Sequence, residues 1–201
     1  MLDNQREAVN QYKDYLIDFN KTVNITSKKN IPFIDFHIND SLALADLVAN
    51  SNLHVDFGSG SGLPAVLIAI YNKTQVICIE SKQKKRVFLN QVKTKLGLSN
   101  LSIYDADVQT FAKHYHGPKI ESFSAKAFAK PPQLLTYLSL FKPSQYDSHA
   151  FCWVPVSKRQ AQFLHEFDDI VEVGDRPYYY FKVALRSFRS YKADLKNRYN
   201  L

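Results

Sequence analysis

Three glycines at alternate positions form the strongest chemical signal in this sequence. Gly58, Gly60 and Gly62 follow the apolar run 53–57 and precede a second apolar run, 63–71. Because glycine has no Cβ, the backbone at these positions can turn tightly and approach a ligand closely. A strand that leads through such a loop into a helix presents backbone N–H groups to that ligand. The spacing therefore predicts a ligand-binding loop, and neighbouring residues must indicate which ligand.

An acidic residue, Asp56, stands two positions before the first glycine and narrows the choice. The dinucleotide fingerprint G-x-G-x-x-G would place its third glycine one residue later than Gly62. The Asp56 carboxylate would repel a pyrophosphate and attract the amine and sulfonium of S-adenosylmethionine. The sequence also lacks the G-K-[S/T] of a phosphate-binding loop and the Ser-His-Asp pattern of a nucleophile elbow. The loop therefore favours S-adenosylmethionine over NAD or a nucleoside triphosphate.

A second acid, Glu80, ends the next apolar run, 76–79. An acidic residue about 20 positions beyond the glycines accepts hydrogen bonds from the ribose hydroxyls of an adenosine cofactor. Taken alone, Glu80 could equally be a solvated carboxylate at the end of a strand. Together with the glycine loop it predicts an adenosine site.

Apolar periodicity predicts the elements that must hold these residues. The expected helices cover 3–19, 32–49 with Pro32 in the first turn, 63–71, 82–96, 107–115 and 131–140. The expected strands cover 53–57, 75–79, 101–104, 122–125 and 150–156, followed by an antiparallel hairpin of 170–173 and 178–185 around the turn 174–177. Repeated β-α-β order predicts a parallel sheet covered on both faces.

The order of elements predicts a Rossmann-like α/β fold, and the loop that favours S-adenosylmethionine indicates the class I methyltransferases that use this cofactor. The expected fold has a mixed sheet, helices on both faces and an N-terminal helical extension. We expect one domain overall, because 201 residues bury a single core well. Within it, residues 1–50 form N-terminal helices packed on the core, 51–190 the methyltransferase domain and 191–201 a basic tail.

Charge and composition point to a polyanionic partner. The net charge is +7 and the pI about 9.3, and lysine and arginine supply most sequence-independent affinity for nucleic acid. The tail contributes Arg186, Arg189, Lys192, Lys196 and Arg198. The candidate RNA-binding cluster is Lys82, Lys84, Lys85 and Arg86, which would equally suit the solvated face of a helix.

Several other classes of protein are disfavoured. The longest apolar stretch, 63–71, is too short to cross a bilayer and the N-terminus has no apolar signal core, so we expect a cytoplasmic protein without membrane contact. Cys78 and Cys152 are isolated, which predicts buried thiols and neither a disulfide nor a metal site.

Four segments resemble the bacterial RsmG (GidB) family, in matching order and spacing. They are 20–26 (NKTVNIT), 37–42 (HINDSL), 56–64 (DFGSGSGLP) and 80–89 (ESKQKKRVFL). The resemblance covers most of residues 10–140, and 176–183 is similar to the family's final strand. It implies methylation of N7 of one guanine in 16S rRNA of the small ribosomal subunit, with S-adenosylmethionine as cofactor. The 16S rRNA or the 30S subunit would be the partner, without an obligatory protein partner.

The resemblance also assigns roles to individual residues. Gly58 and Leu63 would contact the cofactor, Glu80 would hold its ribose, and Val108 with Gln109 would flank the adenine. The full cofactor-binding set is then Asp56, Gly58, Gly60, Gly62, Leu63, Glu80, Ser81, Val108, Gln109 and Lys126.

Three residues, His37, Asp40 and Lys126, are the catalytic candidates. The family's S-R-A-F appears here as 125–128 (AKAF), so Lys126 replaces an arginine near cofactor and substrate, keeping the charge but losing the planar fork. His37 and Asp40 lie one turn apart on the predicted helix 32–49. Alone, they suit a capping or packing interaction, whereas the resemblance assigns them to the cofactor or RNA pocket.

Two departures from the family concern the half of the site that would face guanine. The family's G-R-x-E appears as 106–109 (ADVQ), so that Asp107 replaces a cation. The family's K-G after the fifth strand is missing from 153–158 (WVPVSK), where Lys158 could partly replace it.

Guanine N7 offers a lone pair without prior proton removal, so positioning and electrostatics suffice and no acid–base dyad is required.

Two alternative functions stay open. The first is a divergent member that binds RNA without turnover, and the second is a methyltransferase for small molecules or proteins. A nicotinamide oxidoreductase is a remote third.

Overall fold

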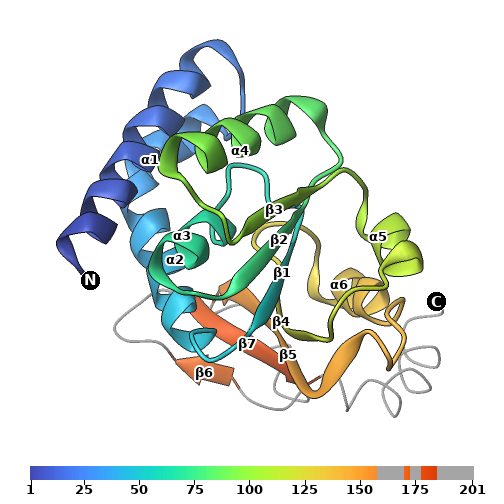
Figure 1. The fold of residues 1–201 in the computed structure, drawn as a ribbon. Helices are drawn as coiled ribbons and strands as arrows, with labels where there is room; N and C mark the ends of the chain where they lie inside the picture. Colours follow the sequence, from blue (N-terminus) through green and yellow to red (C-terminus); the bar gives the residue numbers. More distant parts are fainter. Residues whose placement is uncertain (158–169, 173–177, 185–201) are drawn as a thin grey trace.

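A seven-stranded mixed sheet forms the centre of the molecule (Figure 1). The computed structural model describes residues 1–157, 170–172 and 178–184. The strands are β1 Leu53–Phe57, β2 Gln75–Ile79, β3 Leu101–Tyr104, β4 Ile120–Ser124, β5 Tyr146–Ser157, β6 Ile170–Glu172 and β7 Tyr178–Ala184. Their spatial order is β3-β2-β1-β4-β5-β7-β6. The first five strands of this order are parallel, while β7 is antiparallel to β5 and β6. The expected mixed sheet and terminal hairpin are confirmed.

Helices follow the strands in the expected alternation. They are α1 Asp3–Thr22, α2 Ile34–Leu47, α3 Ala65–Tyr71, α4 Gln83–Leu96, α5 Val108–His114 and α6 Pro131–Leu138. A 3₁₀ helix, η1 Lys28–Phe33, precedes α2. The expectation that one helix covers 32–49 was wrong at its start, because Pro32 lies inside η1 and α2 begins after it. The Ser27 side chain accepts a hydrogen bond from the Lys29 N–H, which begins a separate short helix.

Helices cover both faces of the sheet, as expected. On one face, α5 and α6 pack over β1 and β4 through an aromatic cluster of Phe57, Phe111, Phe123 and Phe141. The other face carries α1, α2, α3 and α4, with Tyr12, Leu16, Phe88 and Leu89 in its core (Figure 1). The N-terminal helices contact this layer directly, α1 touching α3 and α4, and α2 touching α3. The sheet therefore lies between two packed helical layers.

Three further observations concern the described residues. None of their helices combines the length and apolar character needed to cross a membrane. They contain no group of three or more histidine, cysteine, aspartate or glutamate residues arranged to hold a metal ion. Cys78 and Cys152 are both buried free thiols, as predicted.

Candidate cofactor and substrate site

The glycine loop joins the carboxyl end of β1 to α3 and needs glycine for its backbone shape. Gly58, Gly60 and Gly62 have φ angles of +62°, +56° and +90°. These values lie in the left-handed region, which side chains with a Cβ rarely occupy. The Ser59 N–H donates to the Ile79 carbonyl over 3.1 Å, which ties the loop to β2. The loop is thus a rigid structure at the strand ends, where ligands of this class of sheet bind.

Glu80 fastens the glycine loop to the start of α4. Its side chain is buried, with only 4% of the residue exposed, so the interpretation as a solvated carboxylate is wrong. Oε2 accepts a hydrogen bond from the Gly60 N–H over 2.9 Å, and Oε1 accepts one from the Lys82 N–H over 2.8 Å. A carboxylate oxygen has room for a second hydrogen bond, so these contacts leave acceptor capacity for a ribose hydroxyl.

Asp56 is a buried carboxylate with one oxygen engaged and one free of hydrogen bonds. Oδ1 accepts a hydrogen bond of 2.5 Å from the Ser124 hydroxyl. Oδ2 is buried without a hydrogen-bond partner among the described residues. Burial raises the pKa of Asp56 to about 6, against the opposing effects of the serine hydroxyls and of the Lys126 charge. A buried acceptor without a partner is costly unless a ligand satisfies it, so Oδ2 is a candidate acceptor for an N–H group of a ligand.

A buried histidine, His54, lies on β1 near Asp56 and contacts the neighbouring strand. Sequence analysis did not identify it. His54 is fully buried on β1, and its Nδ1 and Nε2 each lie 2.8 Å from a serine hydroxyl of β4, Ser122 and Ser124 respectively. Burial lowers the pKa of His54 to about 3, so the ring is neutral at neutral pH. The signal that could have found this group is alternation, because His54 and Asp56 are paired in register with Ser122 and Ser124.

The three catalytic candidates come together between α2 and the loop after β4. Lys126 Nζ forms an ion pair of 2.9 Å with Asp40 Oδ2, and the two side chains are 17% and 3% exposed. The same ammonium donates to the His37 main-chain carbonyl over 3.2 Å and to the Ser41 hydroxyl over 3.4 Å. Burial and, secondarily, the Lys126 charge lower the pKa of His37, so its imidazole is neutral at neutral pH. These contacts make Lys126 a cross-link that holds α2 against the sheet.

The loop after β4 turns through a left-handed alanine and covers the glycine loop. Ala127 has a φ of +53°, a conformation that non-glycine residues adopt at a cost and that often marks a functional loop. On its far side, Phe128 covers Gly58 so closely that a Cβ on Gly58 would lie 2.5 Å from Phe128 Cδ2. Phe128 is a residue that sequence analysis missed, although it follows Lys126 in the AKAF segment.

The expected adenine-flanking residues begin α5. Val108 is buried and Gln109 is exposed. Asp107 caps this helix, because its carboxylate accepts a hydrogen bond of 2.7 Å from the Thr110 N–H. This backbone contact also lowers the pKa of Asp107. The acid that stands where the family has a cation therefore has a structural role at the start of α5.

Comparison with known proteins decides the family. The sequence profile of GidB, described as rRNA small subunit methyltransferase G, matches residues 5–146, more than half of the chain. The chain belongs to this family. The matched segment contains the glycine loop, Glu80 and the Asp40–Lys126 ion pair.

Individual relatives support the assignment. The chain is 34% identical to Ribosomal RNA small subunit methyltransferase G of Brachyspira hyodysenteriae over 142 residues, which cover 70% of this chain and 67% of that protein. It is 37% identical to the protein of the same name from Nitrosomonas eutropha over 121 residues, 59% of this chain and 55% of that protein. The chain thus matches between about half and two thirds of the length of these curated relatives.

Solved structures confirm the fold class. The structure resembles cofactor-bound Rv0187 from MTB with a TM-score of 0.60 and 12% identity, over 92% of this chain and 91% of that chain. A SAM-dependent O-methyltransferase from Thermotoga maritima aligns with a TM-score of 0.51 and 15% identity, over 72% of this chain and 64% of that chain. At such identities the likeness concerns the fold alone, which is the expected α/β methyltransferase fold.

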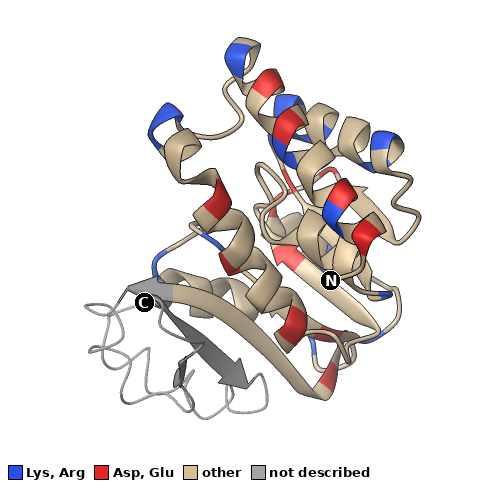
Figure 2. Ribbon diagram, turned by 90° about the vertical axis from the view of Figure 1, so that its left-hand side faces the viewer, with Lys and Arg blue, Asp and Glu red and all other residues tan. Residues whose placement is uncertain are grey.

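The four expected RNA-binding side chains of this GidB family member differ in their surroundings. Figure 2 colours the basic and acidic positions along the described ribbon. Lys82 and Lys84 are exposed and Lys85 is half-buried, with its Nζ 3.5 Å from where a Cβ on Gly60 would stand. Arg86 is only 16% exposed, pairs with Asp105 over 2.9 Å and donates to the Glu80 carbonyl. Of the other expected basic groups, Lys158 and the tail Arg186, Arg189, Lys192, Lys196 and Arg198 lie outside the described residues.

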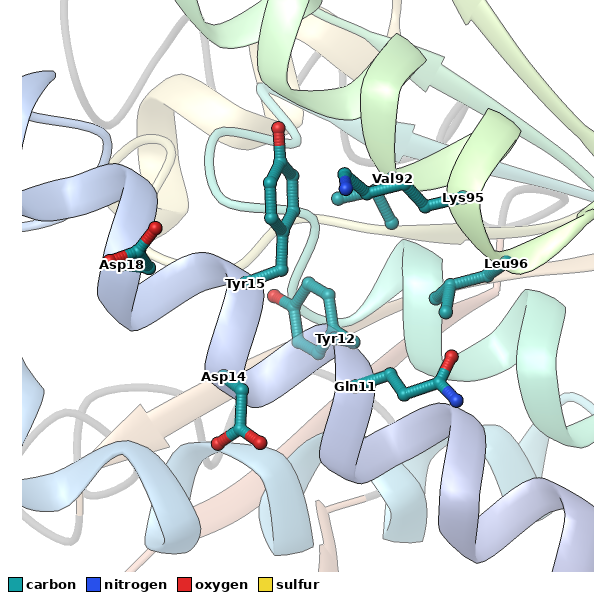
Figure 3. Close-up of a pocket in the computed structure, with 8 residues that line it drawn as sticks. All are labelled: Gln11, Tyr12, Asp14, Tyr15, Asp18, Val92, Lys95 and Leu96. Carbon is teal, nitrogen blue, oxygen red and sulfur yellow. The ribbon is translucent and has the colours of Figure 1, made fainter.

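A pocket lies between α1 and α4 (Figure 3), and none of its lining residues is among the expected cofactor-binding residues. Its volume is about 490 Å³, and Tyr12, Tyr15 and Lys95 are among its lining residues. The Tyr12 hydroxyl donates to the Ser61 carbonyl in the glycine loop over 2.7 Å. The pocket therefore lies behind the loop and touches one of its supports.

Proposed function

We propose that this protein methylates N7 of a guanine in 16S rRNA of the small ribosomal subunit, with S-adenosylmethionine as the methyl donor. The observation that carries the proposal is the family match over residues 5–146, because that segment includes every residue built into the glycine-loop site. The partner would be 16S rRNA or the 30S subunit, and the cytoplasm is where that substrate is found.

The residues at the strand ends suit this cofactor. When bound, S-adenosylmethionine supplies an electrophilic methyl group. Asp56 would bind the amine with its free oxygen, Glu80 would bind ribose hydroxyls, and Val108 with Gln109 would flank the adenine. Gly58, Gly60, Gly62, Leu63 and Ser81 would line the loop around it. The fit rests on the unpartnered Asp56 oxygen and on the open backbone at Gly60.

Catalysis at guanine N7 would need positioning more than proton transfer. Asp40 neutralises much of the Lys126 charge, so Lys126 would act by holding the cap of Ala127 and Phe128 over the glycine loop. Its charge also lowers the Asp56 pKa, although burial raises that pKa by more. His37 would contribute through its main-chain carbonyl, which accepts a hydrogen bond from Lys126, and its lowered pKa disfavours a role in proton uptake.

The RNA backbone would be held by the exposed lysines at the start of α4. Lys82 and Lys84 are exposed at this end of α4 and the Lys85 ammonium lies beside Gly60, so phosphate contacts there would place the target base. Arg86 would contribute less, because the Asp105 carboxylate and two backbone carbonyls already engage its guanidinium.

The decisive experiment measures methyl transfer from labelled S-adenosylmethionine to 30S subunits and to protein-free 16S rRNA. Digestion of the product to nucleosides should give N7-methylguanosine at a single position. The matched control is Asp56→Asn, which should fold and bind RNA but transfer less label at limiting cofactor, because its affinity for S-adenosylmethionine should fall. Label at another atom, or none in either RNA while the cofactor binds, would overturn the proposal. The second result would leave an RNA-binding protein without turnover or a methyltransferase with another substrate.

A further inference from the structure

Four buried polar side chains form a hydrogen-bonded row across β1 and β4, and the row ends at Asp56, just before the glycine loop. The register pairs His54 with Ser122 and Asp56 with Ser124, so all four side chains lie on one face of these strands. Each of the four residues is at most 1% exposed. The hydroxyl of Ser122, the ring of His54, the hydroxyl of Ser124 and the carboxylate of Asp56 follow one another at hydrogen-bond distances.

When Asp56 is ionised, the hydrogen bonds of this row can have only one donor-to-acceptor direction. The Ser124 hydroxyl has a single hydrogen, which it donates to Asp56 Oδ1. It must therefore accept at its oxygen from His54 Nε2–H. A neutral ring that carries its hydrogen on Nε2 leaves Nδ1 as an acceptor, so the Ser122 hydroxyl donates to Nδ1. Each hydrogen bond of the row then has one donor and one acceptor, and the last acceptor is the Asp56 carboxylate.

The two carboxylate oxygens of Asp56 therefore differ in their hydrogen bonding. Oδ1 is occupied by Ser124, whereas Oδ2 has no hydrogen-bond partner among the described residues. Carboxylates rotate about their last bond unless a contact holds them. A Ser124 hydroxyl locked by His54 holds the carboxylate plane and keeps Oδ2 available to a cationic ligand group.

We propose that His54 is a positioning residue for the cofactor: through Ser124 it orients the Asp56 carboxylate toward the α-amino group of S-adenosylmethionine. The inference rests on the proposed use of this cofactor and is independent of the methylated substrate. His54 itself lies one hydroxyl away from the carboxylate and touches no ligand. An aliphatic residue at position 54 would pack equally well in the sheet, but it would leave two buried hydroxyls without their partner.

The test compares two ligands that differ in the amino acid moiety. S-adenosylhomocysteine carries the α-amino group, and 5′-methylthioadenosine keeps the adenosine and sulfur without it. Calorimetric titration of both ligands into the wild type and into His54→Leu, His54→Gln, Ser124→Ala and Ser122→Ala yields the affinity ratio for each protein. General damage to the loop lowers both affinities, whereas misplacement of Asp56 lowers only the first.

His54→Leu and Ser124→Ala should each weaken S-adenosylhomocysteine by about tenfold, the scale of one charge-assisted hydrogen bond. Their affinity for 5′-methylthioadenosine should stay within about twofold of the wild type. His54→Gln keeps an N–H for Ser124 and should recover most of the loss, while Ser122→Ala, at the far end, should have the smallest effect. In an Asp56→Asn background, His54→Leu should cause no further change in the ratio.

Equal losses for both ligands, or an unchanged ratio in His54→Leu and Ser124→Ala, would overturn the role of His54. The His54→Gln variant guards against misfolding, since it preserves the polar character of the site. Failure of the wild type to bind S-adenosylhomocysteine would overturn both this role and the proposed cofactor. Failure to methylate rRNA would leave these binding ratios untouched and would count against the substrate alone.

Discussion

The two sides of the glycine loop are built on different physical principles. Toward the sheet, Asp56, Glu80 and His54 are buried, and their hydrogen bonds fix them in place. Toward solvent, Lys82 and Lys84 at the start of α4 are exposed. The inner side recognises one small molecule through geometry set in advance, while the outer side suits a large polyanion through charge alone. Substitutions should therefore act on the two sides with different magnitudes and different responses to salt.

The largest effect is expected where the inner side is closed by an ion pair. Lys126→Ala leaves the Asp40 carboxylate buried without its cation, which costs about 3–5 kcal/mol of folding free energy. Lys126→Arg keeps the charge and should lose far less. Urea denaturation of both variants measures the difference, and equal stabilities would show that the ion pair does not hold α2 to the sheet.

Ionised Asp56 is expected to lower the stability of the fold while it increases the affinity for the cofactor. Its pKa is raised to about 6, so the ionised form disfavours folding. The stabilising contribution is complete below the ordinary aspartate range and is lost as the pH rises through about 6. At pH 8, Asp56→Asn should be more stable than the wild type by about 2–3 kcal/mol, although it should bind S-adenosylmethionine at least about tenfold more weakly. Chemical denaturation at pH 8 and pH 5 tests this, since the gain should shrink at the lower pH.

A smaller effect is expected from the glycine loop itself, and the chain supplies a matched control. Gly58→Ala introduces a Cβ at positive φ that would lie 2.5 Å from Phe128. Gly97 has a similar φ of +63°, and the Cβ introduced by Gly97→Ala would have nothing within 4 Å. Both substitutions should cost about 1 kcal/mol in backbone strain, but only Gly58→Ala should weaken cofactor binding. Similar cofactor affinities in the two variants would contradict the close approach of Phe128 to the loop.

The smallest effects belong to the outer side. Replacing Lys82, Lys84 and Lys85 singly with glutamine should weaken RNA binding by about 1 kcal/mol or less each at moderate salt. Removing one lysine–phosphate interaction should reduce the slope of log affinity against log salt by about 0.7–0.9. Filter binding across a salt series measures this slope, and cofactor affinity should not change. Arg86→Gln is the contrasting variant, expected to lower stability more than it changes the slope, because Asp105 and backbone carbonyls engage the guanidinium.

Local features of the chain were predictable because short-range geometry controls them. The spacing of Gly58, Gly60 and Gly62 indicated a loop that the structure confirms, since their positive φ angles follow from the turn itself. Strand and helix order followed from apolar periodicity. The boundary at Pro32 was wrong because Pro32 lies near the end of a separate 3₁₀ helix, Lys28–Phe33, and α2 begins only after it.

Interactions between distant segments were harder to predict, because their partners are set by sheet register. Lys126 and Asp40 are both catalytic candidates from the sequence, but nothing local shows that they pair. His54 was overlooked since a lone histidine in an apolar run has no partner in its own segment, and its serines are 68 and 70 residues away. The difference between Arg86 and its lysine neighbours depends on Asp105, which only the fold brings close.

The hydrogen bond from Tyr12 to the Ser61 carbonyl makes the first helix part of the machinery that shapes the cofactor loop. Engineering that trims the chain to a minimal sheet from residue 51 would remove this strut and leave the loop unsupported from behind. A compound wedged between α1 and α4 would reach the same tyrosine. Such a compound would touch a support of the cofactor loop from the side opposite the cofactor.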